Sequence, residues 1–186
     1  MSIYFTSDQH YFHKNIIKYC NRPFVSVDNM NADMTRKYNH IIDDDDIVIH
    51  IGDISAGLKD KKDELKEICK NLKGKKYLIR GNHDHLTDEE YLAMGFIGVS
   101  SYLIMEDYFI CHYPLIPETK YTTKAELELI KAYKESKCTK LIHGHSHSID
   151  FGNHKYNVCV DLNGFMPLSF DYIKDQLALN RKEKRL

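Results

Sequence analysis

The segment KYLIRGNHD, residues 76–84, decides the fold, because it joins a short apolar run directly to a glycine and three polar side chains. The run 76–80 has the length and composition expected of a β-strand. Gly81 permits a tight turn after it, and Asn82, His83 and Asp84 follow at once. The segment therefore predicts a strand that delivers polar side chains at its carboxyl end.

The same arrangement occurs four more times along the chain. SIYFT at 2–6, DIVIHI at 46–51, DYFIC at 107–111 and KLIH at 140–143 each precede histidine or aspartate. In an open α/β sheet, ligands bind beyond the carboxyl ends of the strands, so five such ends predict one converged site. The side chains there that can bind a metal are Asp8, His10, Asp53, Asn82, His112, His145 and His147. Oxygen and imidazole ligands without thiolate suit manganese, iron or zinc at a hydrolytic centre.

Taken in order, the motifs D-x-H, GD, GNHD, H and GH-x-H resemble those of the calcineurin-like metallophosphoesterase superfamily. SDQHYFHKNII at 7–17 and CHYPL at 111–115 are most similar to its small prokaryotic and phage members. The motif residues run from Asp8 to His147, so the resemblance covers most of the chain. It implies a four-layer α/β/β/α sandwich with mixed β-sheets and a dinuclear metal site at the carboxyl edge of the strands.

The resemblance also implies a role for each motif residue. Two divalent ions (manganese, iron or zinc, with manganese favoured) would share Asp53. Asp8, His10 and His147 would complete one metal site, and Asn82, His112 and His145 the other. A hydroxide bridging the ions would attack phosphorus. His83 would contact the phosphate or protonate the leaving oxygen, with Asp84 holding its imidazole in the required tautomer.

The charge of this ligand set favours an anionic substrate. Only Asp8 and Asp53 carry negative charge, so two divalent ions would leave the centre cationic. Three further residues, His13, Asn15 and Arg22, follow the first motif closely and could reach the mouth of the site. Arg22 could fork onto a phosphate or form a surface ion pair, and the sequence does not choose between these alternatives.

The predicted activity is hydrolysis of a phosphate ester, with a phosphodiester favoured because the motifs and their scaffold leave no room for a large cap domain. A phosphomonoesterase of the same mechanism is the alternative, and a non-catalytic scaffold on the same fold is a weaker one. Hydrolysis of an amide is disfavoured because the HExxH spacing of zinc proteases is missing. The expected substrate is a small phosphorylated or nucleotide molecule.

Composition restricts the partners of this 186-residue chain, which we expect to form a single domain over residues 1–186. A net charge of −1 gives no global attraction to nucleic acid or anionic membranes, and no apolar run is long enough to span a bilayer. Five cysteines without a CxxC pair predict reduced thiols in a cytoplasmic protein, with Cys111 in the core. The basic end 180–186 is expected to complement a helix dipole rather than bind RNA. The oligomeric state is not predictable from the sequence.

Hydrophobic periodicity and capping residues predict the remaining elements. Helices are expected at 15–20, from a cap at Ser26 to Ile41, at 60–72, at 87–94, from Thr122 or Thr123 to 136, and after a cap at Ser169. Strands are expected at 2–6, 47–51, 76–80, 97–105, 108–111, 140–143 and 155–160.

Overall fold

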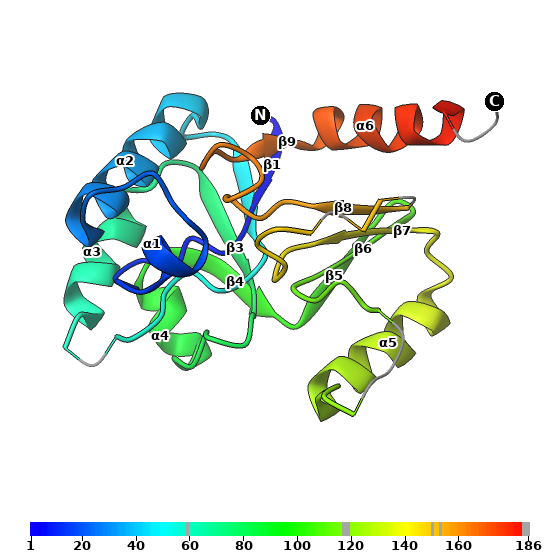
Figure 1. Cartoon of the computed structure of the whole chain (residues 1–186), viewed down its shortest axis with the longest axis horizontal. Helices are drawn as coiled ribbons and strands as arrows, with labels where there is room; N and C mark the ends of the chain where they lie inside the picture. The colour runs from blue at the N-terminus through cyan, green and yellow to red at the C-terminus, as the bar shows by residue number, and fades with distance from the viewer. Residues whose placement is uncertain (59, 117–119, 150, 153, 184–186) are drawn as a thin grey trace.

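The fold is built on two β-sheets that pack face to face, with helices on their outer faces (Figure 1). It is seen in a computed structural model that describes residues 1–58, 60–116, 120–149, 151–152 and 154–183. Side chains beyond residue 179 lie outside this description, and so does the basic end of the chain.

The first sheet has five strands in the order β4-β3-β2-β1-β9. Its strands are β1 (Ile3–Thr6), β2 (Ile47–His50), β3 (Lys75–Ile79), β4 (Phe96–Ser100) and β9 (Leu168–Ser169). The first four are parallel to one another, and β9 runs antiparallel to β1. The carboxyl ends of β1, β2 and β3 therefore meet at one edge of the sheet.

The second sheet has four strands in the order β5-β6-β7-β8. They are β5 (Tyr102–Met105), β6 (Tyr108–Cys111), β7 (Lys140–His143) and β8 (Lys155–Asn157). The last three are parallel, and β5 is antiparallel to β6. Both sheets are thus mixed, as expected.

The helices supply the outer layers. Helices α1 to α4 lie beside the first sheet, α5 lies beside the second, and α6 extends along one end of the sandwich (Figure 1). The four-layer α/β/β/α prediction is confirmed. The helices are α1 (Ile16–Tyr19), α2 (Val27–Ile41), α3 (Lys62–Asn71), α4 (Asp88–Ala93), α5 (Lys124–Ser136) and α6 (Phe170–Glu183).

Alternation along the central strands fills the core on both faces of each sheet. In β2, Val48 packs toward the helices with Tyr38 of α2, and Ile49 packs between the sheets. In β6, Phe109 packs beneath α5, and Ile110 packs between the sheets. Strands covered on both faces are apolar throughout, which explains the apolar runs of the sequence.

Three helices begin at the predicted caps. The side chains of Ser26, Thr87 and Thr123 each accept a hydrogen bond from the backbone amide three residues later. Thr87 and Thr123 also form capping boxes, with Glu90 and Glu126 respectively, so two amides are satisfied at each helix start. Ser169 likewise accepts a hydrogen bond from the amide of Tyr172.

Two predicted strands are wrong in their extent. The run 97–105 forms two strands, because the chain leaves the first sheet after β4 and enters the second as β5. Only Ser101 separates them, and the apolar pattern continues across it, so periodicity gives no sign of the change of layer. The strand expected at 155–160 ends earlier, at Asn157, while Val158–Val160 stay buried.

Among the described residues, no helix is long and apolar enough to cross a bilayer. The five cysteines are free thiols, and Cys111 is fully buried, as predicted for a core residue.

Candidate active site

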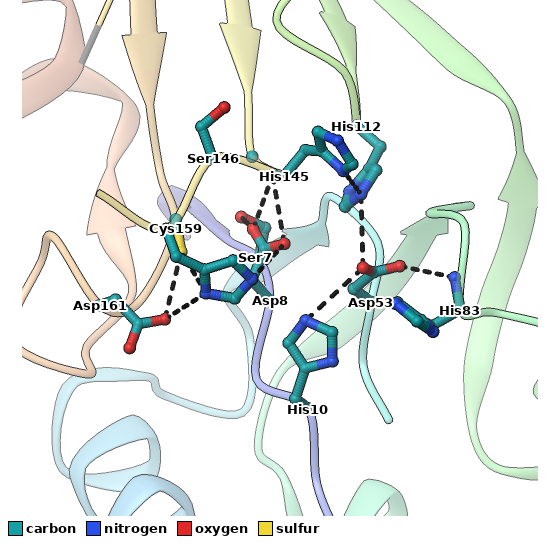
Figure 2. A network of polar contacts seen from close by, with 12 residues as sticks. Ser7, Asp8, His10, Asp53, His83, His112, His145, Ser146, Cys159 and Asp161 are labelled. Carbon is teal, nitrogen blue, oxygen red and sulfur yellow. Dashed lines mark hydrogen bonds and ion pairs between the residues drawn. The ribbon is translucent and has the colours of Figure 1, made fainter. Parts of the chain in front are cut away.

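Five strand ends from the two sheets meet in one cluster of aspartate and histidine side chains (Figure 2). Backbone hydrogen bonds join the loops that follow the strands. The amide of Asp8 donates to the carbonyl of Gly52 at 3.0 Å, and that of His10 donates to the carbonyl of Asp53 at 3.0 Å. Across the sheets, the amide of His145 donates to the carboxylate of Asp8 at 3.0 and 3.1 Å. The five strand ends therefore lie together, as the sequence predicts.

Four members of the cluster have a left-handed backbone. The φ angles are 61° at Asp8, 52° at His10, 55° at Asp53 and 66° at His145. Residues other than glycine adopt this region rarely and at a cost of order 1–3 kcal/mol each. Such strain concentrates at functional sites, where the surrounding structure holds it.

Glycines make room for the carboxylates. A Cβ atom on Gly81 would lie 2.2 Å from Oδ1 of Asp53, and one on Gly144 would lie 2.5 Å from Oδ2 of Asp8. The GNHD and GHSH glycines are therefore required for the approach of the two carboxylates, not only for a turn.

Asp53 lies at the centre of the cluster and belongs to two groups of ligand atoms. It forms one group with Asp8 and His10 and another with His112 and His145, and within each group the ligand atoms lie within 4.8 Å of one another. Its Oδ2 atom is 3.5 Å from Nε2 of His10 and 3.5 Å from Nε2 of His112. A single carboxylate thus faces both groups.

His10 and His112 each present a ring nitrogen to Asp53. Burial lowers the pKa of His10 to about 2, and both of its ring nitrogens are buried without a hydrogen-bond partner in the described part of the chain. Nδ1 of His112 lies 2.8 Å from the carbonyl oxygen of Ile51. That oxygen can only accept, so the proton sits on Nδ1 and the lone pair of Nε2 faces Asp53.

Asn82 and His145 complete the second group. Oδ1 of Asn82 is 3.1 Å from Nε2 of His112 and 3.0 Å from Nδ1 of His145. Burial and the neighbouring His112 both lower the pKa of His145. Three potential ligand atoms from three strand ends are therefore in mutual contact.

His147 lies on the other side of the cluster, beside Asp8. Its Nε2 atom is 3.8 Å from Oδ1 of Asp8, and its Nδ1 atom is 2.6 Å from Oδ2 of Asp161. Burial alone would lower the pKa of His147, but the carboxylates of Asp161 and Asp8 outweigh it and raise the pKa. The thiol of Cys159 is also near, yet burial raises its pKa well above the ordinary value and keeps it protonated.

Asp161 contacts the cluster through His147, and the sequence analysis missed it. It follows the apolar stretch 158–160, as the predicted ligands follow their strands, so the same signal could have found it. Although burial raises the pKa of its carboxyl, contacts with His147 and Arg22 lower it further than burial raises it.

The structure corrects the proposed substrate role of Arg22. Its guanidinium is buried and donates to both carboxylate oxygens of Asp161 at 2.8 Å, and to the carbonyls of Asp8 and Gln9 at 2.8 Å. It forms an ion pair, as one alternative held, but the pair is buried rather than on the surface. Arg22 thus holds the Asp8 loop directly and His147 through Asp161.

The structure also corrects the role expected of Asp84. Its buried carboxylate accepts hydrogen bonds from the amides of Asp53 at 2.7 Å, Gly81 at 2.8 Å and Ile54 at 3.2 Å, and from the hydroxyl of Tyr91 at 3.2 Å. Burial raises its pKa. Asp84 therefore ties the Asp53 loop to the GNHD turn and does not hold the His83 imidazole.

His83 lies at the exposed margin of the cluster, next to Asp53 (Figure 2). Its amide donates to Oδ1 of Asp53 at 2.8 Å, and its ring centroid is 5.3 Å from that of His10. His13 is half-buried on the same side, 5.6 Å from His10 between ring centroids. Asn15 is exposed at the start of α1, and its side chain makes no capping hydrogen bond.

The residues present fit divalent metal ions. Imidazole nitrogens, two aspartates and an amide oxygen converge, and the buried nitrogens of His10 have no hydrogen-bond partner among the residues that the structure describes. A two-sheet α/β sandwich with such a cluster at its parallel strand ends defines a metallohydrolase.

Comparison with known proteins gives the particular family. The profile of the Calcineurin-like phosphoesterase superfamily domain matches residues 1–163, and the chain belongs to this superfamily. It is accordingly a hydrolase of phosphoric esters that uses divalent metal ions.

Two similar proteins extend the match over nearly the whole chain. An uncharacterized protein of Methanocaldococcus jannaschii is 31% identical over 179 residues, which cover 92% of this chain and 88% of the relative. A solved structure of a protein of unknown function from Aquifex aeolicus has 28% identity and a TM-score of 0.76, and the alignment covers 94% of this chain and 98% of that one.

Proposed function

We propose that the protein is a phosphodiesterase that uses two divalent metal ions, with manganese favoured, and shares Asp53 between them. The observation that carries the proposal is the membership of Asp53 in both ligand groups. Asp8, His10 and His147 would complete one metal site, and Asn82, His112 and His145 the other. When bound, such ions supply a water acidic enough to attack at neutral pH and positive charge for the phosphate.

The protein's own residues hold this arrangement in place before substrate arrives. The carbonyl of Ile51 fixes the tautomer of His112, and Asp161 fixes that of His147. Asp84 and Arg22 hold the loops of Asp53 and Asp8. Such partners orient the ligands and raise their basicity. The polar groups of the site are therefore already in position before the reaction begins.

His83 is the residue that we assign to leaving-group departure. Its backbone is fixed on Asp53, while its side chain is exposed beside the cluster and can reach a bound ester. A protonated imidazole there would donate a proton to the leaving oxygen. His13, on the same side of His10, would contact the phosphate, and Asn15 would lie at the rim.

Openness of the site favours a diester. Asn82, His83 and His145 are exposed, and in the described part of the chain no segment forms a cap over them. A phosphate bound there can carry an organic group on each side. A net charge of −1 favours a small substrate over a nucleic acid polymer.

The test is turnover by protein stripped of metal and reloaded with manganese, on bis-p-nitrophenyl phosphate and p-nitrophenyl phosphate in parallel. Metal content is counted in the same samples. We expect two ions per chain and faster hydrolysis of the diester. Preference for the monoester would favour a phosphomonoesterase, and two bound ions without turnover of either ester would favour the non-catalytic scaffold.

A further inference from the structure

A pocket next to the second ligand group is lined by residues of both β5 and α5. Its volume is about 340 Å³, at the lower end of the range of small-molecule sites. The residues that line it and bear on its ligand are Arg80, Gly81, Tyr102, Tyr113, Ala125 and Glu128. None of them is among the predicted ligands or substrate residues.

Two lining residues connect the pocket to the metal ligands. The ring centroid of Tyr113 is 5.1 Å from that of His112 and 5.1 Å from that of His145. Gly81 directly precedes Asn82 and reaches the Asp53 carboxylate. An ester whose phosphate sits at Asn82, His112 and His145 therefore has the pocket beside one of its substituents.

The pocket is not built for a second phosphate. The guanidinium of Arg80 is already engaged, since it pairs with Asp88 and donates to the carbonyls of Asp84 and Leu86 at 2.9 and 2.8 Å. Glu128, at the other side, is negatively charged and 71% exposed at its side chain. The two cations beside the pocket, Arg80 and Lys124, are already paired with Asp88 and Glu128, so an uncharged group is favoured over a further anion.

Aromatic side chains favour a planar group. Tyr102 is 40% exposed, and its ring is held by stacking on Phe109, with centroids 4.8 Å apart and planes at 15°. Tyr113 provides a second ring, and Ala125 leaves space between α5 and these rings. Aromatic rings held in place bind nucleobases by stacking, with little dependence on the base.

We propose that this pocket binds the nucleobase of a nucleotide ester whose phosphate lies at the metal ligands. The inference rests on the proposed function and narrows its substrate class to nucleotides. It assigns Tyr102, Tyr113 and Ala125 to recognition of the base.

Adenosine 5′-monophosphate and ribose 5-phosphate test the proposal, because they differ only in the base. Their affinities for manganese-loaded protein are measured by isothermal titration calorimetry, with phosphate release followed in the same samples. We expect the nucleotide to bind about tenfold more tightly or better. Equal affinities, including undetectable binding of both at millimolar concentration, would overturn the proposal.

Variants locate the effect in the pocket. Ala125→Trp places a ring in the space at an exposed helix position, and Lys134→Trp is the matched control farther along α5. Ala125→Trp should lower the affinity for adenosine 5′-monophosphate to that for ribose 5-phosphate. The affinity for ribose 5-phosphate should stay unchanged. Lys134→Trp should match wild type. Tyr102→Ala gives a second route should Ala125→Trp not fold, and retention of the base preference in every folded pocket variant would contradict the assignment.

Failure of this inference can be told apart from failure of the proposed function. Turnover of bis-p-nitrophenyl phosphate tests the metal chemistry alone. If the protein hydrolyses bis-p-nitrophenyl phosphate but binds the two ligands equally, only the nucleobase site is contradicted. If it binds metal but does not hydrolyse the diester, the proposed function is contradicted as well.

Discussion

The Nδ1 atom of His147 lies 2.6 Å from Oδ2 of Asp161, whose two carboxylate oxygens also accept hydrogen bonds from Arg22. This pair fixes the tautomer of His147 and directs its Nε2 atom toward Asp8, 3.8 Å from Oδ1. A partner of this kind determines the orientation and basicity of a metal-binding imidazole.

Asp161→Asn should weaken metal binding at the Asp8 site. The amide keeps the size of the side chain but removes the charge and one acceptor, so metal affinity should fall about 10- to 100-fold. Titration of metal-free protein with manganese measures this. Asp33→Asn, at a surface pair with Arg36 and Lys37, is the matched control and should not change it. An unchanged affinity in Asp161→Asn would contradict the role.

Asp53→Asn should disturb both metal ions together. The carboxylate belongs to both ligand groups, and an amide offers only one oxygen, so the count of bound ions should drop and turnover should be lost. Circular dichroism should show that the fold survives. Loss of one ion with the other retained, or near-normal turnover, would exclude a shared ligand.

His83→Gln should separate chemistry from metal binding. We expect two ions to stay bound and the rate to fall by about 10²- to 10⁴-fold, the range typical of a lost general acid or base. The loss should shrink for esters with better leaving groups, which need no proton. Rates across a series of substituted phenyl diesters measure this. An equal loss of rate for all of them would show that His83 is not the general acid.

The predicted site residues converge because each motif follows an apolar run that the fold makes a strand. Once β1 and β2 pair in parallel, Asp8 and Asp53 meet at their carboxyl ends, and packing of the second sheet on the first brings His112 to Asp53. Local pattern is enough for this step because the strands are short and the ligands follow at once.

Side-chain direction inside the loops was not predictable in the same way. Asp84 is next to His83 in sequence, yet the turn at 81–85 directs its carboxylate to the amides of Asp53 and Ile54. Arg22 and Asp161 are 139 residues apart, and nothing local in the sequence pairs them. Such contacts depend on tertiary packing, as does the crossing from β4 to β5.

His50 provides a pH dependence that is separate from the metal ligands. It is fully buried at the end of β2, where burial and the charge of Lys76 lower its pKa to about 3, and its Nε2 atom is 3.4 Å from the hydroxyl of Tyr38. In the unfolded chain the imidazole of His50 is protonated below about pH 6.5, whereas in the folded chain it stays neutral at that pH. The stability that neutral His50 contributes is therefore fully present above that pH and is lost as the pH drops toward 3, by at most about 1.4 kcal/mol per pH unit.

His50→Gln should remove this contribution. The variant should be less stable than wild type at pH 7, since the ring packs against Tyr38 and Phe96, but the difference in unfolding free energy should narrow as the pH falls. Urea unfolding between pH 7 and 4, with metal chelated throughout, measures it. Val48→Ala, in the same core cluster as Tyr38, removes no titrating group and no hydrogen-bond partner of His50, and should give a difference independent of pH. If the gap between wild type and His50→Gln is equally constant, His50 does not stay neutral in the folded protein.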